Sequence, residues 1–166
     1  MTILIAVDPG LTGAIASYDT KRGRLDVMAM PTYLQAKGKA AKRVTLDENE
    51  LVALITTLHG LGATHLFIEE VQGLPKQSAS AAFNFGYGYA VIITTARVLG
   101  MVVERVRPER WKAALRVPKD KNAARARASE MIPTHKHLWP LVKDDGKAEA
   151  ALIAIYGEQR LSGKIR

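Results

Sequence analysis

The feature that most constrains the fold of this chain is a short apolar run near its start that ends in an acid. Residues 3–8, Ile-Leu-Ile-Ala-Val-Asp, are typical of a strand buried on both faces. A proline and two glycines within residues 9–13 predict a tight turn, and residues 13–18 predict a second strand running back beside the first. A carboxylate at the end of a central strand is costly to bury unless a cation meets it. Asp8 is therefore either a turn cap or part of a charged site.

The rest of the chain alternates strand-like and helix-like patterns. Apolar runs with strand spacing follow at residues 24–30, 64–71 and 101–106. Helical patterns are found at residues 47–58, 80–99, 108–115, 119–132 and 143–156. A strand, a helix and a second strand in this order imply a right-handed crossover and parallel pairing. We expect a single α/β domain over residues 1–166, with a five-stranded mixed sheet flanked by helices; strands 1–3 are antiparallel and strands 4–5 parallel.

Charge and cysteine content narrow the class of protein. The formal net charge of +8 favours a polyanionic partner, and because no basic amphipathic anchor is evident, nucleic acid is favoured over a membrane surface. The chain has no cysteine, which excludes disulfides and thiolate metal sites. It shows no apolar run long enough to span a bilayer and no signal-peptide pattern at its start. We therefore expect a cytoplasmic protein with no membrane partner.

Two stretches concentrate positive charge. Residues 31–46 lack clear periodicity and predict a basic loop, which is either a solvated connector or a flap that contacts phosphates. The second stretch leads into the helix pattern that ends near Pro133. The candidate DNA-contacting residues in these two stretches are Lys37, Lys39, Lys42, Arg43, Lys119, Lys121, Arg125 and Arg127. No groove-reading motif stands out, so we expect selectivity to come from DNA shape rather than base edges.

The last predicted helix places acids at the head of an apolar stripe. Asp145 and Glu149 are four residues apart, so they share one helix face, and that face continues to Tyr156. Two like charges at this spacing repel each other, and burying them is costly unless a cation lies between them and Asp8. Asp144 is explained by a helix cap or first-turn acid, which the helix dipole favours. That explanation does not extend to Glu149.

A third acidic cluster ends the predicted fourth strand. Glu69 and Glu70 point to opposite sides of the strand, and periodicity does not choose between them because both strand faces are apolar. If strands 1 and 4 are parallel neighbours, Asp8 and one of these glutamates emerge at the same sheet edge. The last helix can then bring its two acids to them. Four oxygen ligands without cysteine suit Mg²⁺ or Mn²⁺, and two such ions about 4 Å apart are suited to phosphodiester hydrolysis.

With these motifs, the sequence resembles the RuvC family of Holliday junction resolvases, within the RNase H-like superfamily, and is most similar to its phage-encoded members. The matching segments are residues 5–13, 67–71 and 144–154, in the family's order and spacing across nearly the whole chain. The resemblance implies an RNase H-like fold and selects Glu69 as the strand ligand. It also implies an endonuclease that cuts four-way junctions and other branched DNA, two Mg²⁺ or Mn²⁺ ions per active site, a homodimer, and a host-cytoplasmic location if the protein is phage-encoded.

The spacing of the last two acids departs from the family pattern. The family ends with two acids three residues apart, whereas here the pairs are Asp145 with Glu149 or Asp144 with Glu149. We favour Asp145, with Asp144 as the alternative metal ligand.

One alternative function is an actin-like or sugar-kinase-type ATP-binding domain, which also begins with an acid-glycine hairpin; this chain is short for it. The other is a catalytically silent nucleic-acid-binding module of the same fold.

Overall fold

The computed structural model describes residues 3–37, 41–70 and 78–165. Its centre is a five-stranded sheet in the order β3-β2-β1-β6-β7. The strands are β1 (Ile3–Asp8), β2 (Ala14–Asp19), β3 (Arg24–Ala29), β6 (Ala63–Glu69) and β7 (Val102–Val106). The pairs β1–β2 and β2–β3 are antiparallel, whereas β1–β6 and β6–β7 are parallel. The predicted mixed sheet and its pairing are therefore confirmed.

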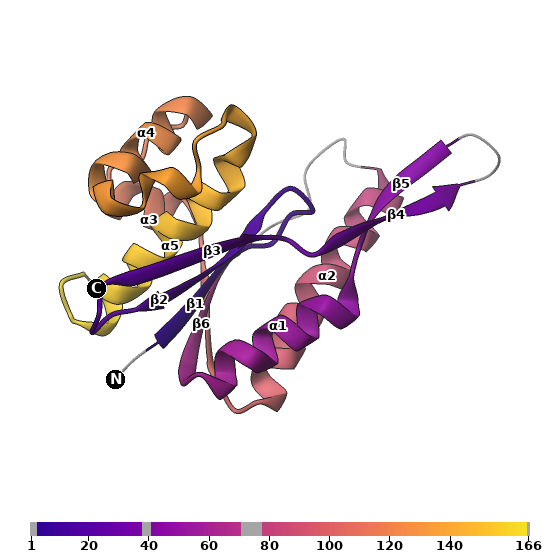
Figure 1. Ribbon diagram of the computed structural model, residues 1–166, viewed down its shortest axis with the longest axis horizontal. Coiled ribbons are helices and arrows are strands. Elements are labelled where there is room, and N and C mark those ends of the chain that lie inside the picture. Colours follow the sequence, from indigo (N-terminus) through magenta and orange to yellow (C-terminus); the bar gives the residue numbers. More distant parts are fainter. Residues whose placement is uncertain (1–2, 38–40, 71–77, 166) are drawn as a thin grey trace.

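Helices cover both faces of the sheet (Figure 1). One face carries α1 (Glu48–Gly60) and α2 (Ala79–Val98). The other carries α3 (Pro108–Ala114), α4 (Lys121–Met131) and α5 (Asp145–Leu161), with the short 3₁₀ turns η1 (Pro133–Leu138) and η2 (Val142–Asp144) between the last two. No helix in the described part of the chain is both long and apolar enough to cross a membrane.

Side-chain alternation along the central strand feeds two separate cores. Leu4 and Ala6 are fully buried in the cluster that contains α5, while Ile5 and Val7 are fully buried in the cluster that contains α1 and α2. Such a strand is apolar at every position because both its faces are covered. The same alternation determines which face of the sheet carries each side chain at the strand ends, and it thereby positions the site.

Helix α5 lies unusually close to the sheet. A Cβ on Gly157 would come within 2.7 Å of the Phe67 ring on β6, so only glycine allows this approach. Leu152, Ile153 and Tyr156 on the same helix are buried, as the predicted apolar stripe requires. The first turn of α5 is thereby held over the edge where β1 and β6 end.

Residues 31–46 differ from the prediction of an irregular basic loop. They contain β4 (Thr32–Lys37) and β5 (Ala41–Leu46), which pair antiparallel as a separate two-stranded sheet. This β4–β5 ribbon projects from the body beside the N-terminal half of α2 (Figure 1). The prediction was wrong because it relied on a buried apolar face, and most side chains of this ribbon are exposed.

Candidate active site

The sheet brings two acids to one edge. Val7 of β1 pairs with Ile68 of β6 in parallel register, so Asp8 and Glu69 follow side by side. Glu69 shares the α5-facing side of its strand with Phe67, which belongs to the α5 core. The neighbouring Glu70 instead forms an ion pair with Arg107 (Nε to Oε2, 3.3 Å).

Helix α5 adds two more acids above that edge. Asp145 is its first residue and Glu149 lies one turn later; both side chains are largely but not fully buried. The charges of Glu149, Glu69 and Asp145 all act on Asp8. Gly146 makes this approach possible, because a Cβ there would lie 2.5 Å from the Thr12 carbonyl oxygen and 3.1 Å from Asp8 Oδ2. Three distant segments of the chain thus contribute four carboxylates to one place.

Asp144 has a different role in this structure. Its carboxylate accepts a hydrogen bond from the Leu141 N–H (2.9 Å) and pairs with Lys147 (3.1 Å). Burial works to raise the pKa of Asp144, but these two partners outweigh it, and the pKa lies below its usual value. Asp144 is therefore tied into the turn before α5, as expected for a cap, while the Asp145 carboxylate is bonded to Lys121 and its charge acts on Asp8.

Burial and nearby like charges change the chemistry of Asp8. Burial, followed by repulsion from Glu149 and Glu69, raises the pKa of its carboxyl from 3.8 to about 7. Burial also raises the pKa of Glu69, although the hydrogen bond from Trp111 works against this shift. A carboxyl group in this state favours either a proton or a nearby cation.

This shift predicts a pH dependence of stability for the metal-free protein. Between pH 3.8 and about 7 the folded protein keeps the Asp8 proton that the unfolded chain has lost, so the free energy of unfolding falls as the pH rises through this window. Thermal unfolding in a chelating buffer at several pH values measures it. Because other acids also titrate, the reference is Asp8→Asn, which should lose less stability over the same window. Parallel profiles for the two proteins would contradict the assignment.

Three basic or polar side chains contact the acids. The indole N–H of buried Trp111 donates to Glu69 Oε1 (3.0 Å). Lys112 Nζ lies 2.8 Å from Glu149 Oε1, and Lys121 Nζ is hydrogen-bonded to Asp145 Oδ2. The sequence predicts a DNA contact for Lys121 and no site role for Trp111 or Lys112. The position of Trp111 and Lys112 just after the Pro108 helix start does not report these contacts, because the contacts depend on how α3 docks.

The donor set can be compared with the needs of a divalent cation. Carboxylate oxygens are the ligands that Mg²⁺ and Mn²⁺ prefer, and the raised pKa of Asp8 reflects its burial together with the negative charges around it. Among the described residues, no three acidic or histidine side chains are close enough together to form an ion-binding cluster as they stand. Two of the four carboxylates are directed at lysines instead. The chemistry of the donors fits a divalent cation, whereas side-chain rotation is needed to gather them around one.

The predicted DNA-contacting residues lie in two places. Lys42 and Arg43 are exposed on β5, whereas the side chain of Lys37 and all of Lys39 lie outside the described residues. Lys119 is exposed in the turn before α4.

The arginines of α4 have partners within the protein. Arg125 Nη1 donates to the Pro140 carbonyl (3.1 Å), and Arg127 Nε donates to the Leu115 carbonyl (3.0 Å). These contacts tie α4 to its neighbours, so a phosphate-binding role for either residue stays a prediction.

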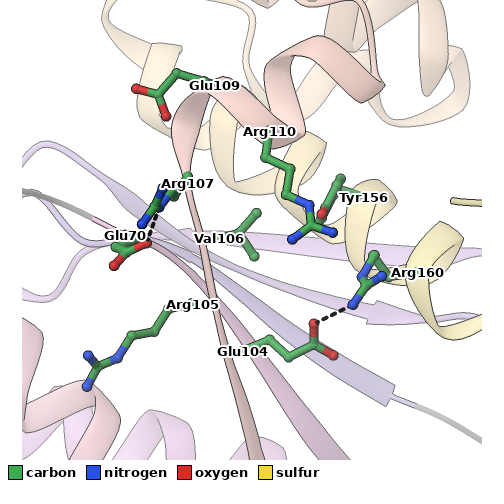
Figure 2. A pocket seen from close by; sticks show the side chains of 9 residues that line it. All are labelled: Glu70, Glu104, Arg105, Val106, Arg107, Glu109, Arg110, Tyr156 and Arg160. Atoms are coloured by element: carbon green, nitrogen blue, oxygen red, sulfur yellow. Dashed lines mark hydrogen bonds and ion pairs between the residues drawn. The ribbon is translucent and has the colours of Figure 1, made fainter. Parts of the chain in front are cut away.

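An open cleft of 820 Å³ adjoins the acidic site along the edge strand β7 (Figure 2). Four of its charged residues form two ion pairs, Arg107 with Glu70 and Arg160 with Glu104 (3.7 Å). Arg105 is directed away from the others in Figure 2, and its guanidinium lies 5.8 Å from the Tyr89 ring centre on α2. The cleft adds arginines near the site that sequence analysis did not single out, but acids balance most of their charge.

Comparison with solved structures finds the same fold in RuvC. A structure of Thermus thermophilus RuvC in complex with a Holliday junction substrate matches with a TM-score of 0.66 and 15% identity, over 98% of this chain and 97% of that one. A second T. thermophilus RuvC structure matches with a TM-score of 0.57 and 16% identity over the same shares. No family model and no curated protein matches the chain. The likeness confirms the predicted RNase H-like α/β fold.

Proposed function

We propose that this protein is a metal-dependent endonuclease that cuts Holliday junctions and other branched DNA by phosphodiester hydrolysis. The observation that carries the proposal is the convergence of Asp8, Glu69, Asp145 and Glu149 from three separate segments, with the pKa of Asp8 raised by burial and by their charges. The fold shared with a RuvC that was solved on a Holliday junction substrate supports the substrate class. The net charge of +8 supports a polyanionic partner.

In this proposal the four carboxylates hold Mg²⁺ or Mn²⁺, two ions per site. When bound, such ions activate water and stabilise the leaving oxygen in phosphodiester hydrolysis. Trp111 fixes the direction of the Glu69 carboxylate, and the two lysines pair with Asp145 and Glu149 until a divalent cation replaces them. Asp144 acts by holding the start of α5 in place rather than as a ligand.

Phosphate contacts from exposed cations supply DNA affinity in this proposal. We expect Lys42→Ala to weaken junction binding several-fold and to reduce the slope of log Kd against log salt by about 0.9, because one phosphate contact is lost. Fluorescence anisotropy at several salt concentrations measures both effects. Lys21→Ala is the matched control, since Lys21 is exposed in the turn between β2 and β3, at the opposite end of the sheet from Asp8. Equal effects of the two substitutions would contradict a specific contact.

A homodimer is the second part of the proposal, because two symmetric sites are needed to cut the two related strands of a junction. The outward face of α2 is its proposed interface. Phe83 and Val98 on this helix are 73% and 80% exposed, which is high for apolar side chains without a partner. Sedimentation analysis of the whole protein tests this part separately from the activity.

The experiment that tests the function is a cleavage assay on three labelled substrates, namely a synthetic four-way junction, a duplex and a single strand. We expect cleavage of the junction with Mg²⁺ or Mn²⁺, little cleavage of the other two, and none in EDTA. Junction binding without cleavage under every metal condition would favour a silent DNA-binding module. Hydrolysis of ATP without DNA would favour the kinase-like alternative.

A further inference from the structure

Most of the β4–β5 ribbon lies outside the two hydrophobic cores. It forms its own sheet and projects from the body (Figure 1). A two-stranded hairpin alone is at best marginally stable in water. Yet Tyr33, Leu34 and Val44 are 46%, 63% and 45% exposed. Large side chains kept exposed on a projecting ribbon indicate a surface that meets a partner.

One face of the ribbon is polar. Cross-strand register pairs Tyr33 with Thr45 and Gln35 with Arg43, so these four side chains lie on the same face. The Thr45 hydroxyl donates to Gln35 Oε1 (3.2 Å), which leaves the amide N–H₂ of Gln35 available as a donor. Arginine and glutamine are the residues that make bidentate contacts with guanine and adenine in the major groove.

The other face is mostly apolar, although it also carries Lys42, and it is turned toward the body at its base. Leu34 pairs with Val44 on that face, and Leu46 follows them into the core beside Gly88 of α2. Val44 and Leu46 also help to line a pocket of 220 Å³ whose far wall includes Phe83. Arg43 and Thr45 of the polar face also border this pocket, while Tyr33, Gln35 and Arg43 are exposed to solvent.

Charge and size suit a DNA duplex. Residues 32–46 contain four Lys or Arg and no Asp or Glu. Each strand has six residues, which corresponds to about 20 Å, and the major groove is about 12 Å wide and admits a two-stranded ribbon. An acidic protein surface would complement the positive charge of the ribbon, but it would not complement the row of hydrogen-bonding side chains on its polar face.

The base of the ribbon is fixed to the acidic site. The Met30 N–H donates to the Gly13 carbonyl (3.0 Å), and Gly13 lies directly against the backbone of Asp8. On the other strand, the Asp47 N–H donates to the Pro31 carbonyl (2.9 Å). A duplex held by the ribbon would therefore keep a set position relative to the carboxylates.

We propose that the β4–β5 ribbon enters the major groove of one duplex arm of the branched substrate and contacts base edges with Gln35 and Arg43. This inference rests on the endonuclease function proposed above, and it adds a dependence on arm sequence to selectivity by junction shape.

Dimethyl sulfate interference tests the proposal, because it methylates N7 of guanine in the major groove. A junction with guanines along every arm is methylated, bound by the whole protein in EDTA, and separated into bound and free fractions. We expect interference at guanines of an arm outside the crossover. The double variant Gln35→Ala, Arg43→Lys should lose this interference and bind about 10-fold or more weakly, with an unchanged salt slope because the charge is kept.

The matched control is Leu34→Ala, a truncation of similar exposure on the opposite face of the same ribbon, which should keep the wild-type pattern. The proposal is overturned if the wild type shows no interference on the arms, if the double variant keeps the pattern, or if Leu34→Ala loses it equally. Cleavage of the same junction in Mg²⁺ separates the two proposals. Cleavage without arm interference removes only the ribbon contact, whereas absence of cleavage removes the endonuclease itself.

Discussion

Asp8→Asn is expected to lower the rate of junction cleavage by at least about 1,000-fold while leaving junction affinity within about threefold of wild type. Asparagine keeps the shape of the side chain but removes a charge that the other three acids surround. Loss of a metal ligand stops hydrolysis, whereas loss of a negative charge does not weaken the binding of a polyanion. Single-turnover cleavage and anisotropy measurements on the same junction give the two numbers.

The control for this variant is Asp26→Asn. Asp26 is an exposed residue of β3 that pairs with Arg24, away from the acidic cluster. The control should cleave and bind as the wild type does. Equal losses of cleavage and binding in Asp8→Asn would mean that Asp8 acts through folding or DNA binding, and undiminished cleavage would remove it from the active site.

Gly146→Ala is expected to produce the second-largest effect. The added Cβ would meet the Thr12 carbonyl oxygen at 2.5 Å, and backbone cannot move aside cheaply. The start of α5 must therefore shift and carry Asp145 and Glu149 with it. We expect a loss of about 1–3 kcal/mol in the free energy of unfolding and of about 100-fold in cleavage rate, since small displacements at an active site are that costly. Denaturant unfolding and the cleavage assay measure the two.

Gly60→Ala provides the same chemical change in open space. Gly60 is the last residue of α1, and a Cβ there meets nothing within 4 Å. This control should be neutral or slightly stabilising, because alanine favours a helix over glycine by about 0.5–1 kcal/mol. If Gly146→Ala behaves like the control, the close approach of α5 to Asp8 is not needed for activity.

Most of the fold could be predicted because its central strands are continuous apolar runs. The stretches that became β1 and β6 are buried on both faces, which makes their sequence pattern strong. The β4–β5 ribbon could not be predicted in the same way. Its stability depends on cross-strand pairing and on one anchoring residue, Leu46, rather than on a repeated apolar position.

The candidate site was predictable where spacing along one helix decides geometry. Asp145 and Glu149 share a face because of their separation, and the chain order places Asp8 at a strand end. Periodicity could not choose between Glu69 and Glu70, since their strand is apolar on both sides.

The lysine and tryptophan contacts lay beyond sequence analysis. Trp111 reaches Glu69 across 42 positions, and Lys112 reaches Glu149 across 37. Such contacts depend on how α3 docks against α5, and no local pattern reports this. The same limit applies to Lys121, whose ammonium meets Asp145, and a DNA contact by this exposed side chain stays a prediction.

The central claim is that acids from distant segments form one divalent-cation site, and direct measurement of Mn²⁺ binding tests it. Titration followed by electron paramagnetic resonance counts the ions bound per protomer without DNA or catalysis. We predict two saturable sites in the wild type and clear loss of binding in both Asp8→Asn and Glu149→Gln, although these residues lie in different elements. Absence of saturable binding in the wild type, or binding that neither substitution alters, would contradict the account.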